Sequence, residues 1–154
     1  MRRALSAIVL NEHGVLSRVV GLFSGRGYNI DSLTVAPVDG TEFSRINIIT
    51  SGDERTYEQI VKQLHKLIPT YKVIEGVDFI EKEMVLVKIK LNENLGGLDA
   101  ILHAYNGKIV HSDDEYFTIL ASDDAKNIDN FLKTIKKYNP VDIARSGSVL
   151  LEIR

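Results

Sequence analysis

The sequence of 154 residues contains no cysteine. This absence excludes disulfide bonds, cysteine-ligated zinc, iron–sulfur clusters and thiol catalysis, and it suits a reducing compartment. The formal net charge is only −2 and the pI is near 6.1. The chain therefore lacks the basic field with which proteins attract nucleic acids or anionic membrane surfaces, and we expect neither as a partner.

Long apolar runs are also missing, and no segment is long enough to span a membrane. The start, MRRALSAIVL, imitates a secretory signal because two arginines precede an apolar stretch. That stretch is short, and no small-residue cleavage site follows it. Its alternating side chains predict a strand instead, and we expect a cytoplasmic protein.

Catalytic and metal-binding motifs are absent as well. The histidines lie far apart and form neither HxxxH nor HExxH spacing; they are His13, His65, His103 and His111. Acidic doublets fall at turns or helix starts, where capping explains them. The sequence predicts no metal site and no catalytic residue in this chain.

Apolar periodicity predicts the element order βαββαβ twice. In the first half we expect a strand at 3–10, a helix from Val15 to Gly25, strands at 29–38 and 42–51 with a bulge near Asp31, a helix capped by Asp53, and a strand at 71–79. In the second half we expect a strand at 84–91, a short helix at 95–105, strands near 107–112 and 115–121, a helix at 123–138, and final strands within 141–153. We place the domain boundary between residues 80 and 81, which gives domains 1–80 and 81–154.

This order predicts an α+β protein made of two ferredoxin-like βαββαβ domains. Right-handed crossovers would give each domain an antiparallel sheet with both helices on one face. The other face would be bare and one edge strand unpaired, so we expect a homodimer. RNA-recognition modules share the order, but their stacking aromatic residues are missing from the first strand, and the third offers only Phe43.

The polar stretch NEHG, residues 11–14, leads directly into the first helix. Backbone N–H groups at a helix start lack intrahelical partners and attract anions, and Gly14 would let a ligand approach the backbone. The side chain of Asn11 has a donor and an acceptor for an ammonium or a carboxylate. We therefore expect a site for a small carboxylate such as an amino acid. The alternative is that Asn11 or His13 caps the helix and Gly14 eases the turn.

The stretch LNEHGVLSRVVGLFSGRGYNIDSLTVAPV, residues 10–38, resembles the N-terminal ACT domain of the acetolactate synthase small (regulatory) subunit family, whose usual form is close to NExGxLxRxxGLFxxRGYNIxSLTV. Ser44-Arg45 and residues 142–147 extend the resemblance. It implies a non-catalytic partner of a large catalytic subunit, which it activates and makes sensitive to feedback inhibition by valine. The large subunit would hold thiamine diphosphate, magnesium and FAD, and this chain no cofactor.

The resemblance further implies that valine lies between the ACT domains of two chains. One chain would contribute Asn11, His13, Gly14, Val15 and Leu16, and the other Asn29 and Ile30. An alternative function of a different class is a stand-alone hydrolase of acylphosphatase type that uses an arginine and an asparagine. The first loop has no such arginine, because Arg18 falls within the expected helix.

Overall fold

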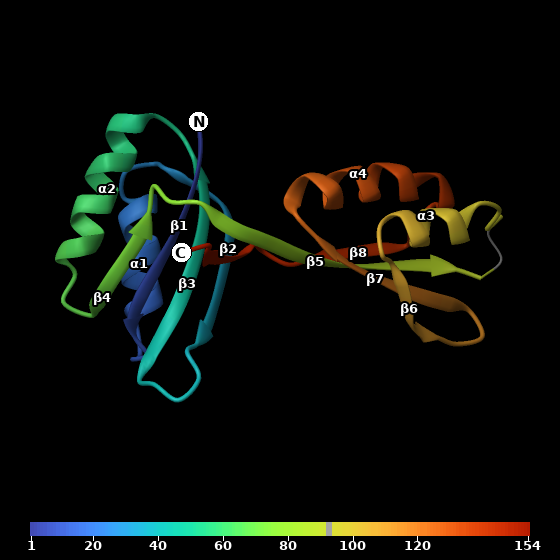
Figure 1. Ribbon diagram of the computed structural model, residues 1–154, viewed down its shortest axis with the longest axis horizontal. Coiled ribbons are helices and arrows are strands. Elements are labelled where there is room, and N and C mark those ends of the chain that lie inside the picture. The colour runs from blue at the N-terminus through green and yellow to red at the C-terminus, as the bar shows by residue number, and fades with distance from the viewer. Residues whose placement is uncertain (92–93) are drawn as a thin grey trace. The chain divides into compact units, whose positions relative to one another are not determined.

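The computed structural model describes residues 1–91 and 94–154, which form two compact units. The first unit comprises residues 1–80 and 148–154, and the second comprises residues 81–147. Each unit follows the order βαββαβ (Figure 1), so the predicted α+β class with two ferredoxin-like units is confirmed.

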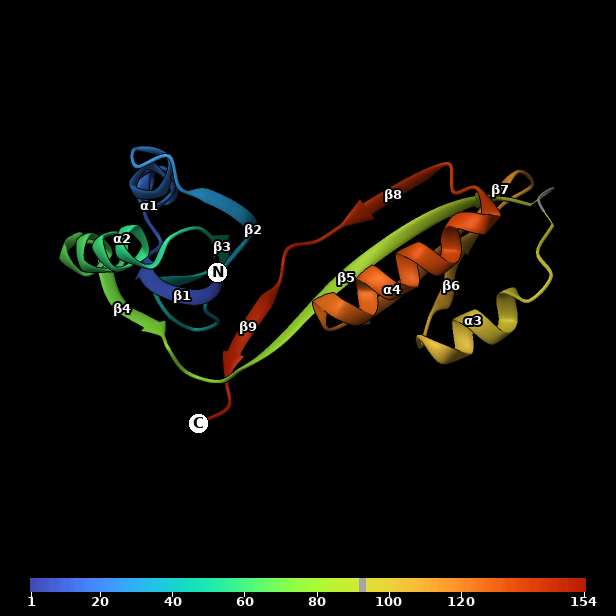
Figure 2. The same cartoon turned by 90° about the horizontal axis from the view of Figure 1, so that it is seen from above.

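The first unit is an antiparallel four-stranded sheet with strand order β2-β3-β1-β4. Its elements are β1 (Arg2–Leu10), α1 (Val15–Ser24), β2 (Asn29–Pro37), β3 (Phe43–Ser51), α2 (Glu54–Lys66) and β4 (Thr70–Glu75). Both helices cover the same face of the sheet (Figure 2), with α1 packed beside β2 and α2 beside β4. Within the described residues β2 is therefore an edge strand whose outer side pairs with nothing.

The core of the first unit lies between the helices and one face of the sheet. Alternate residues of β1 point into it, among them Leu5 and Ala7, and Ile46 and Ile48 of β3 lie opposite them. The helix α2 begins where the sequence predicted, because the Asp53 side chain accepts a hydrogen bond of 3.0 Å from the Thr56 N–H.

The bulge expected near Asp31 is also confirmed, since the pairing of β2 with β3 shifts register between Ile30 and Ser32. The strand predicted at 71–79 ends earlier than expected. The chain turns at Gly76, whose φ of 66° lies in the left-handed region, so β4 ends at Glu75. Phe79 instead begins a longer strand, β5 (Phe79–Lys90).

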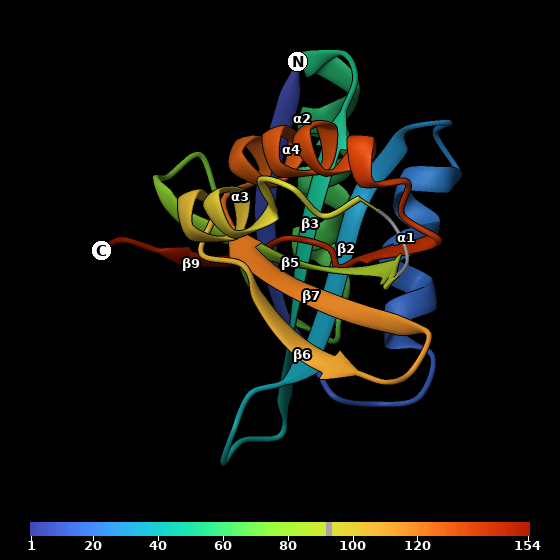
Figure 3. The same ribbon diagram turned by 90° about the vertical axis from the view of Figure 1, so that its right-hand side faces the viewer.

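The second unit is built from β5, α3 (Leu98–Ala104), β6 (Lys108–Ser112), β7 (Tyr116–Asp123), α4 (Ala125–Ile135) with a 3₁₀ turn (Lys136–Tyr138), and β8 (Asp142–Arg145). The strand order is β6-β7-β5-β8, and β9 (Val149–Glu152) also pairs with β5. Figure 3 shows α3 and α4 on one face of this sheet. Their apolar faces bury Leu98, Ile128 and Phe131.

The end of the chain corrects the expectation of a bare sheet face. Residues 148–154, which lie in the second predicted domain, pack with the first unit. They also cover part of the sheet face that we expected to be bare, because Ser148 bonds to side chains of β2 and Leu150 is only 1 % exposed. That face carries buried polar groups, including Ser6 and Asn47, which are satisfied within the sheet: the Ser6 hydroxyl donates to the Asn47 side-chain oxygen at 2.7 Å.

Arg145 is the cation beside the buried carboxylate of Glu83, to which it donates a hydrogen bond, and it also donates one of 2.7 Å to Asp129. We predict that Arg145→Met lowers the free energy of unfolding by about 2 kcal/mol, less than the full cost of breaking a buried pair because Arg145 is partly exposed. Urea unfolding followed by circular dichroism measures this loss.

Lys82→Met is the matched control, because Lys82 pairs with Asp123 at 3.5 Å on the surface and its side chain is 55 % exposed. An exposed pair of this kind contributes about 0.5 kcal/mol or less. Equal losses for the two variants would contradict the dependence of Glu83 on Arg145. Adding Glu83→Gln to Arg145→Met should recover much of the stability, since no buried charge then remains at that position.

Candidate functional site

The start of α1 has no side-chain cap. Gly14 occupies the N-cap position with a φ of 82°, and among the described residues no side chain forms a capping hydrogen bond there. The alternative that Asn11 or His13 caps this helix is therefore not what the structure shows. With no acidic residue in the first turn either, the positive end of the helix dipole at Gly14 meets no protein anion within its own turn.

The loop before α1 is held by backbone hydrogen bonds. The Asn11 N–H donates to the Glu42 carbonyl at 2.8 Å, and the Glu12 N–H donates to the Leu10 carbonyl at 2.9 Å. The side chains of Asn11 and His13 are exposed. A rigid backbone with exposed polar side chains is suited to hold a ligand at the helix start.

Val15 and Leu16 point to different surroundings. The side chain of Val15 is 4 % exposed and belongs to the core, so only its backbone lies at the helix start. Leu16 is 37 % exposed and is available to an apolar ligand group. The Val15 side chain faces the core because the helical period turns this position toward the sheet.

Asn29 and Ile30 lie at the other end of the sheet from the loop at 11–14. Asn29 pairs with Ser51, which in turn pairs with Arg2 at the start of β1, whereas the loop follows Leu10 at its end. β1 has nine residues, so its ends are about 27 Å apart at roughly 3.4 Å per residue. The seven predicted residues therefore form two groups within one chain, and a single chain does not bring them together.

Asp31 organises the second group, and sequence reasoning noticed it only as part of a bulge. The Asn29 amide donates a hydrogen bond of 2.7 Å to the Asp31 carboxylate, which also accepts one from the Ser51 hydroxyl. One N–H of the Asn29 side-chain amide is thus engaged, and its second N–H and its side-chain carbonyl oxygen remain for a ligand. A carboxylate beside this oxygen favours a cationic ligand group such as an ammonium.

Tyr28 anchors the start of β2. Its ring packs against Phe23 with ring centroids 6.5 Å apart, and its hydroxyl donates to the Asp53 carbonyl at 3.4 Å. Burial, more than the nearby carboxylates of Asp53 and Glu54, raises the pKa of this phenol above its usual value. Tyr28 therefore stays neutral at physiological pH and serves as a fixed support for Asn29.

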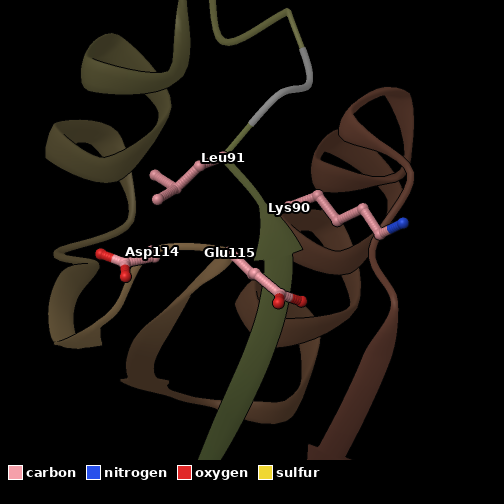
Figure 4. A pocket seen from close by; sticks show the side chains of 4 residues that line it. All are labelled: Lys90, Leu91, Asp114 and Glu115. Atoms are coloured by element: carbon pink, nitrogen blue, oxygen red, sulfur yellow. The ribbon is translucent and has the colours of Figure 1, made fainter.

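A cavity of about 370 Å³ lies in the second unit, lined by Lys90, Leu91, Asp114 and Glu115 (Figure 4). The Lys90 amine points away from Leu91 and Asp114, so these side chains do not converge on one point. None of the predicted site residues lines this cavity. Among the described residues, no group of three or more histidine or acidic side chains could hold a metal ion, and no helix is long and apolar enough to cross a membrane.

Comparisons with known proteins decide the family. A family described as "AHAS small subunit-like ACT domain" matches residues 5–72, and one described as "Small subunit of acetolactate synthase" matches residues 82–153. The acetolactate synthase isozyme 3 small subunit of Escherichia coli (strain K12) is 44 % identical over 156 residues, which cover 97 % of this chain and 94 % of that protein. The chain belongs to the acetolactate synthase small-subunit family.

Further relatives extend the match over nearly the whole chain. The acetolactate synthase small subunit of Buchnera aphidicola subsp. Baizongia pistaciae is 43 % identical over 151 residues, covering 96 % of this chain and 95 % of that protein. The crystal structure of the small subunit from Thermotoga maritima superposes with a TM-score of 0.89 at 30 % identity, covering 100 % of this chain and 98 % of that one. The resemblance to this family read from residues 10–38 is therefore confirmed.

Proposed function

We propose that this chain is the regulatory subunit of an acetolactate synthase, that it activates the catalytic large subunit, and that it confers feedback inhibition by valine. Membership of the small-subunit family across both halves of the chain carries this proposal. Thiamine diphosphate, magnesium and FAD would then belong to the large subunit, and this chain would contribute no catalytic group.

A second copy of the chain completes the effector site. The outer side of β2 is an edge with no pairing strand in the described part of the chain, and antiparallel pairing of two β2 strands would continue the sheet. Asn29 begins β2, and Pro37 at the far end of β2 pairs with Ser44. This is the end of the sheet at which β1 finishes with Leu10 and α1 begins. Antiparallel pairing therefore carries Asn29 of one copy to the end of the sheet where Gly14 of the other copy lies.

The two groups of residues suit the two charges of an amino acid. The uncapped start of α1 at Gly14 would take the carboxylate, with the Asn11 amide as a further donor. The side-chain carbonyl oxygen of Asn29 and the Asp31 carboxylate would bind the ammonium. Leu16 and Ile30 supply apolar surface for a branched side chain.

The deciding experiment measures acetolactate formation by the large subunit with and without this chain, titrated with valine. We expect the chain to raise turnover and valine to remove most of that increase, because coupling between sites is typically about 1–3 kcal/mol. Calorimetry on the chain alone should detect valine, whereas isobutyrate and isobutylamine, which each lack one charge, should not bind measurably. Turnover that is indifferent to this chain would reject the proposal, and isobutyrate that binds as tightly as valine would reject the ammonium site.

A further inference from the structure

The end of the chain is hydrogen-bonded to the strand that carries Asn29. We call residues 148–153 the C-terminal segment. The Ser148 N–H donates to the Ser32 hydroxyl at 2.8 Å, and the Thr34 hydroxyl donates to the Ser148 carbonyl at 3.0 Å. Ser148 and Leu150 are each only 1 % exposed. The segment is therefore packed onto β2 and specifically bonded to it.

A row of polar side chains across the sheet connects the hydrogen bonds of Ser148 to a second attachment of the segment, at Glu152. Arg45 forms an ion pair of 3.5 Å with Glu152 of the segment and donates hydrogen bonds of 3.3 Å to Ser6 and Asn47. The Asn47 amide in turn donates to the Thr34 hydroxyl at 2.9 Å. Both ends of the segment are thus connected through one hydrogen-bonded network over β1, β2 and β3.

The bulge of β2 lies between this network and the candidate effector residues. Ser32 follows the bulge directly, and Asp31 within it accepts the hydrogen bond from the Asn29 amide. The residue that holds the segment and the residue that orients Asn29 are therefore adjacent in the chain. A shift of Ser32 would change the position of the Asp31 carboxylate, because a bulge is held by fewer ladder hydrogen bonds than a regular strand.

We propose that the C-terminal segment controls effector affinity by holding the bulge of β2, with Ser32 as a positioning residue that does not itself contact the effector and Asp31 as the neighbouring carboxylate that it positions. This inference rests on the proposed function, since the effector is taken to be valine. When the segment is seated, Ser32 is fixed and Asp31 holds the Asn29 side chain in its binding orientation. When the segment is released, Asn29 loses that orientation and valine binds more weakly.

Linkage makes this control reciprocal. If the seated segment strengthens valine binding by some factor, valine must stabilise the seated segment by the same factor. The chain enters the segment at Ser148, directly after Gly147, the last residue of the second unit. The chain therefore crosses between the units at residues 147–148, directly before the segment, and at residues 80–81 within β5.

The test uses the full-length chain with Ser32→Ala and Thr34→Val, each of which removes one hydrogen bond to Ser148. Valine affinity is measured by calorimetry, and amide hydrogen exchange of residues 149–152 by mass spectrometry. We expect a valine Kd about five- to tenfold higher for Ser32→Ala, the effect of one hydrogen bond, and at least as large an increase for Thr34→Val, which also removes the acceptor of the Asn47 amide, together with faster exchange of the segment in both variants. Saturating valine should slow exchange of the segment in the unmodified chain.

Thr70→Val is the matched control, because Thr70 lies on the opposite edge strand, β4. Its buried hydroxyl makes no hydrogen bond within the described residues. It should leave both the Kd and the exchange of residues 149–152 unchanged. Asn29→Ala should abolish valine binding and leave segment exchange unchanged. This result distinguishes loss of the Asn29 contact with valine from loss of the segment that positions Asn29.

The outcomes distinguish the two proposals. If the unmodified chain does not bind valine, the proposed function fails and the control by the segment fails with it. If the unmodified chain binds valine and Ser32→Ala and Thr34→Val bind it equally well despite faster segment exchange, only the control by the segment is overturned. Unchanged exchange in both variants would overturn it too, because the segment would then not depend on these bonds.

Discussion

Gly14→Asp is expected to abolish valine binding and valine inhibition while activation of the large subunit persists. The added carboxylate would stand at the uncapped start of α1, where the valine carboxylate is proposed to bind. Two carboxylates about 4 Å apart repel by roughly 4 kcal/mol at an effective dielectric constant near 20, which is about a thousandfold in affinity. The fold should survive because aspartate tolerates the left-handed region and favours a helix N-terminus, and a β-carbon on Gly14 would meet nothing within 4 Å.

Gly14→Asn is the matched control, since it adds the same number of heavy atoms without the charge. It should bind valine more weakly than the unmodified chain but far more tightly than Gly14→Asp. Calorimetry gives both affinities, and thermal unfolding shows that both variants remain folded. Equal affinities for the Asp and Asn variants would mean that no ligand carboxylate binds near Gly14, and full affinity in both would remove Gly14 from the site.

A mixed dimer of one Asn11→Ala chain and one Asn29→Ala chain is expected to bind valine, although neither homodimer does. Asn11→Ala and Asn29→Ala should each remove valine binding from their own homodimers, because every shared site then lacks one of its polar contacts. In a dimer with one chain of each kind, one site carries both substitutions and the other carries neither. That dimer should bind one valine per two chains with the affinity of the unmodified protein.

Co-expression with two different affinity tags and tandem purification would isolate the mixed dimer, and calorimetry would give its stoichiometry. A dimer in which one chain carries both substitutions and the other carries none is the control. Each of its sites lacks one contact, so it should bind no valine. A mixed dimer that behaves like either homodimer would contradict a site shared between chains, while binding by the control dimer would place both asparagines in the same chain's site.

The sequence by itself determined the local structure of this protein. Apolar periodicity located the βαββαβ order in both halves, the Asp53 side chain marked the start of α2, and the change of phase after Ile30 marked the bulge in β2. The motif from Asn11 to Ile30 pointed to the family. Each of these signals depends on residues close together in the chain, where backbone geometry alone links side-chain pattern to structure.

The tertiary structure alone decided which distant segments meet. Ser148 bonds to Ser32 across 116 residues of chain, and no local pattern marks that contact, so the sequence did not predict that the C-terminal segment packs on β2. Periodicity places Val15 on an apolar face but does not say that the face is the core rather than a pocket. The support of Asn29 by Asp31 likewise depends on how the bulge folds, because side-chain direction at a bulge no longer follows the strand's alternation.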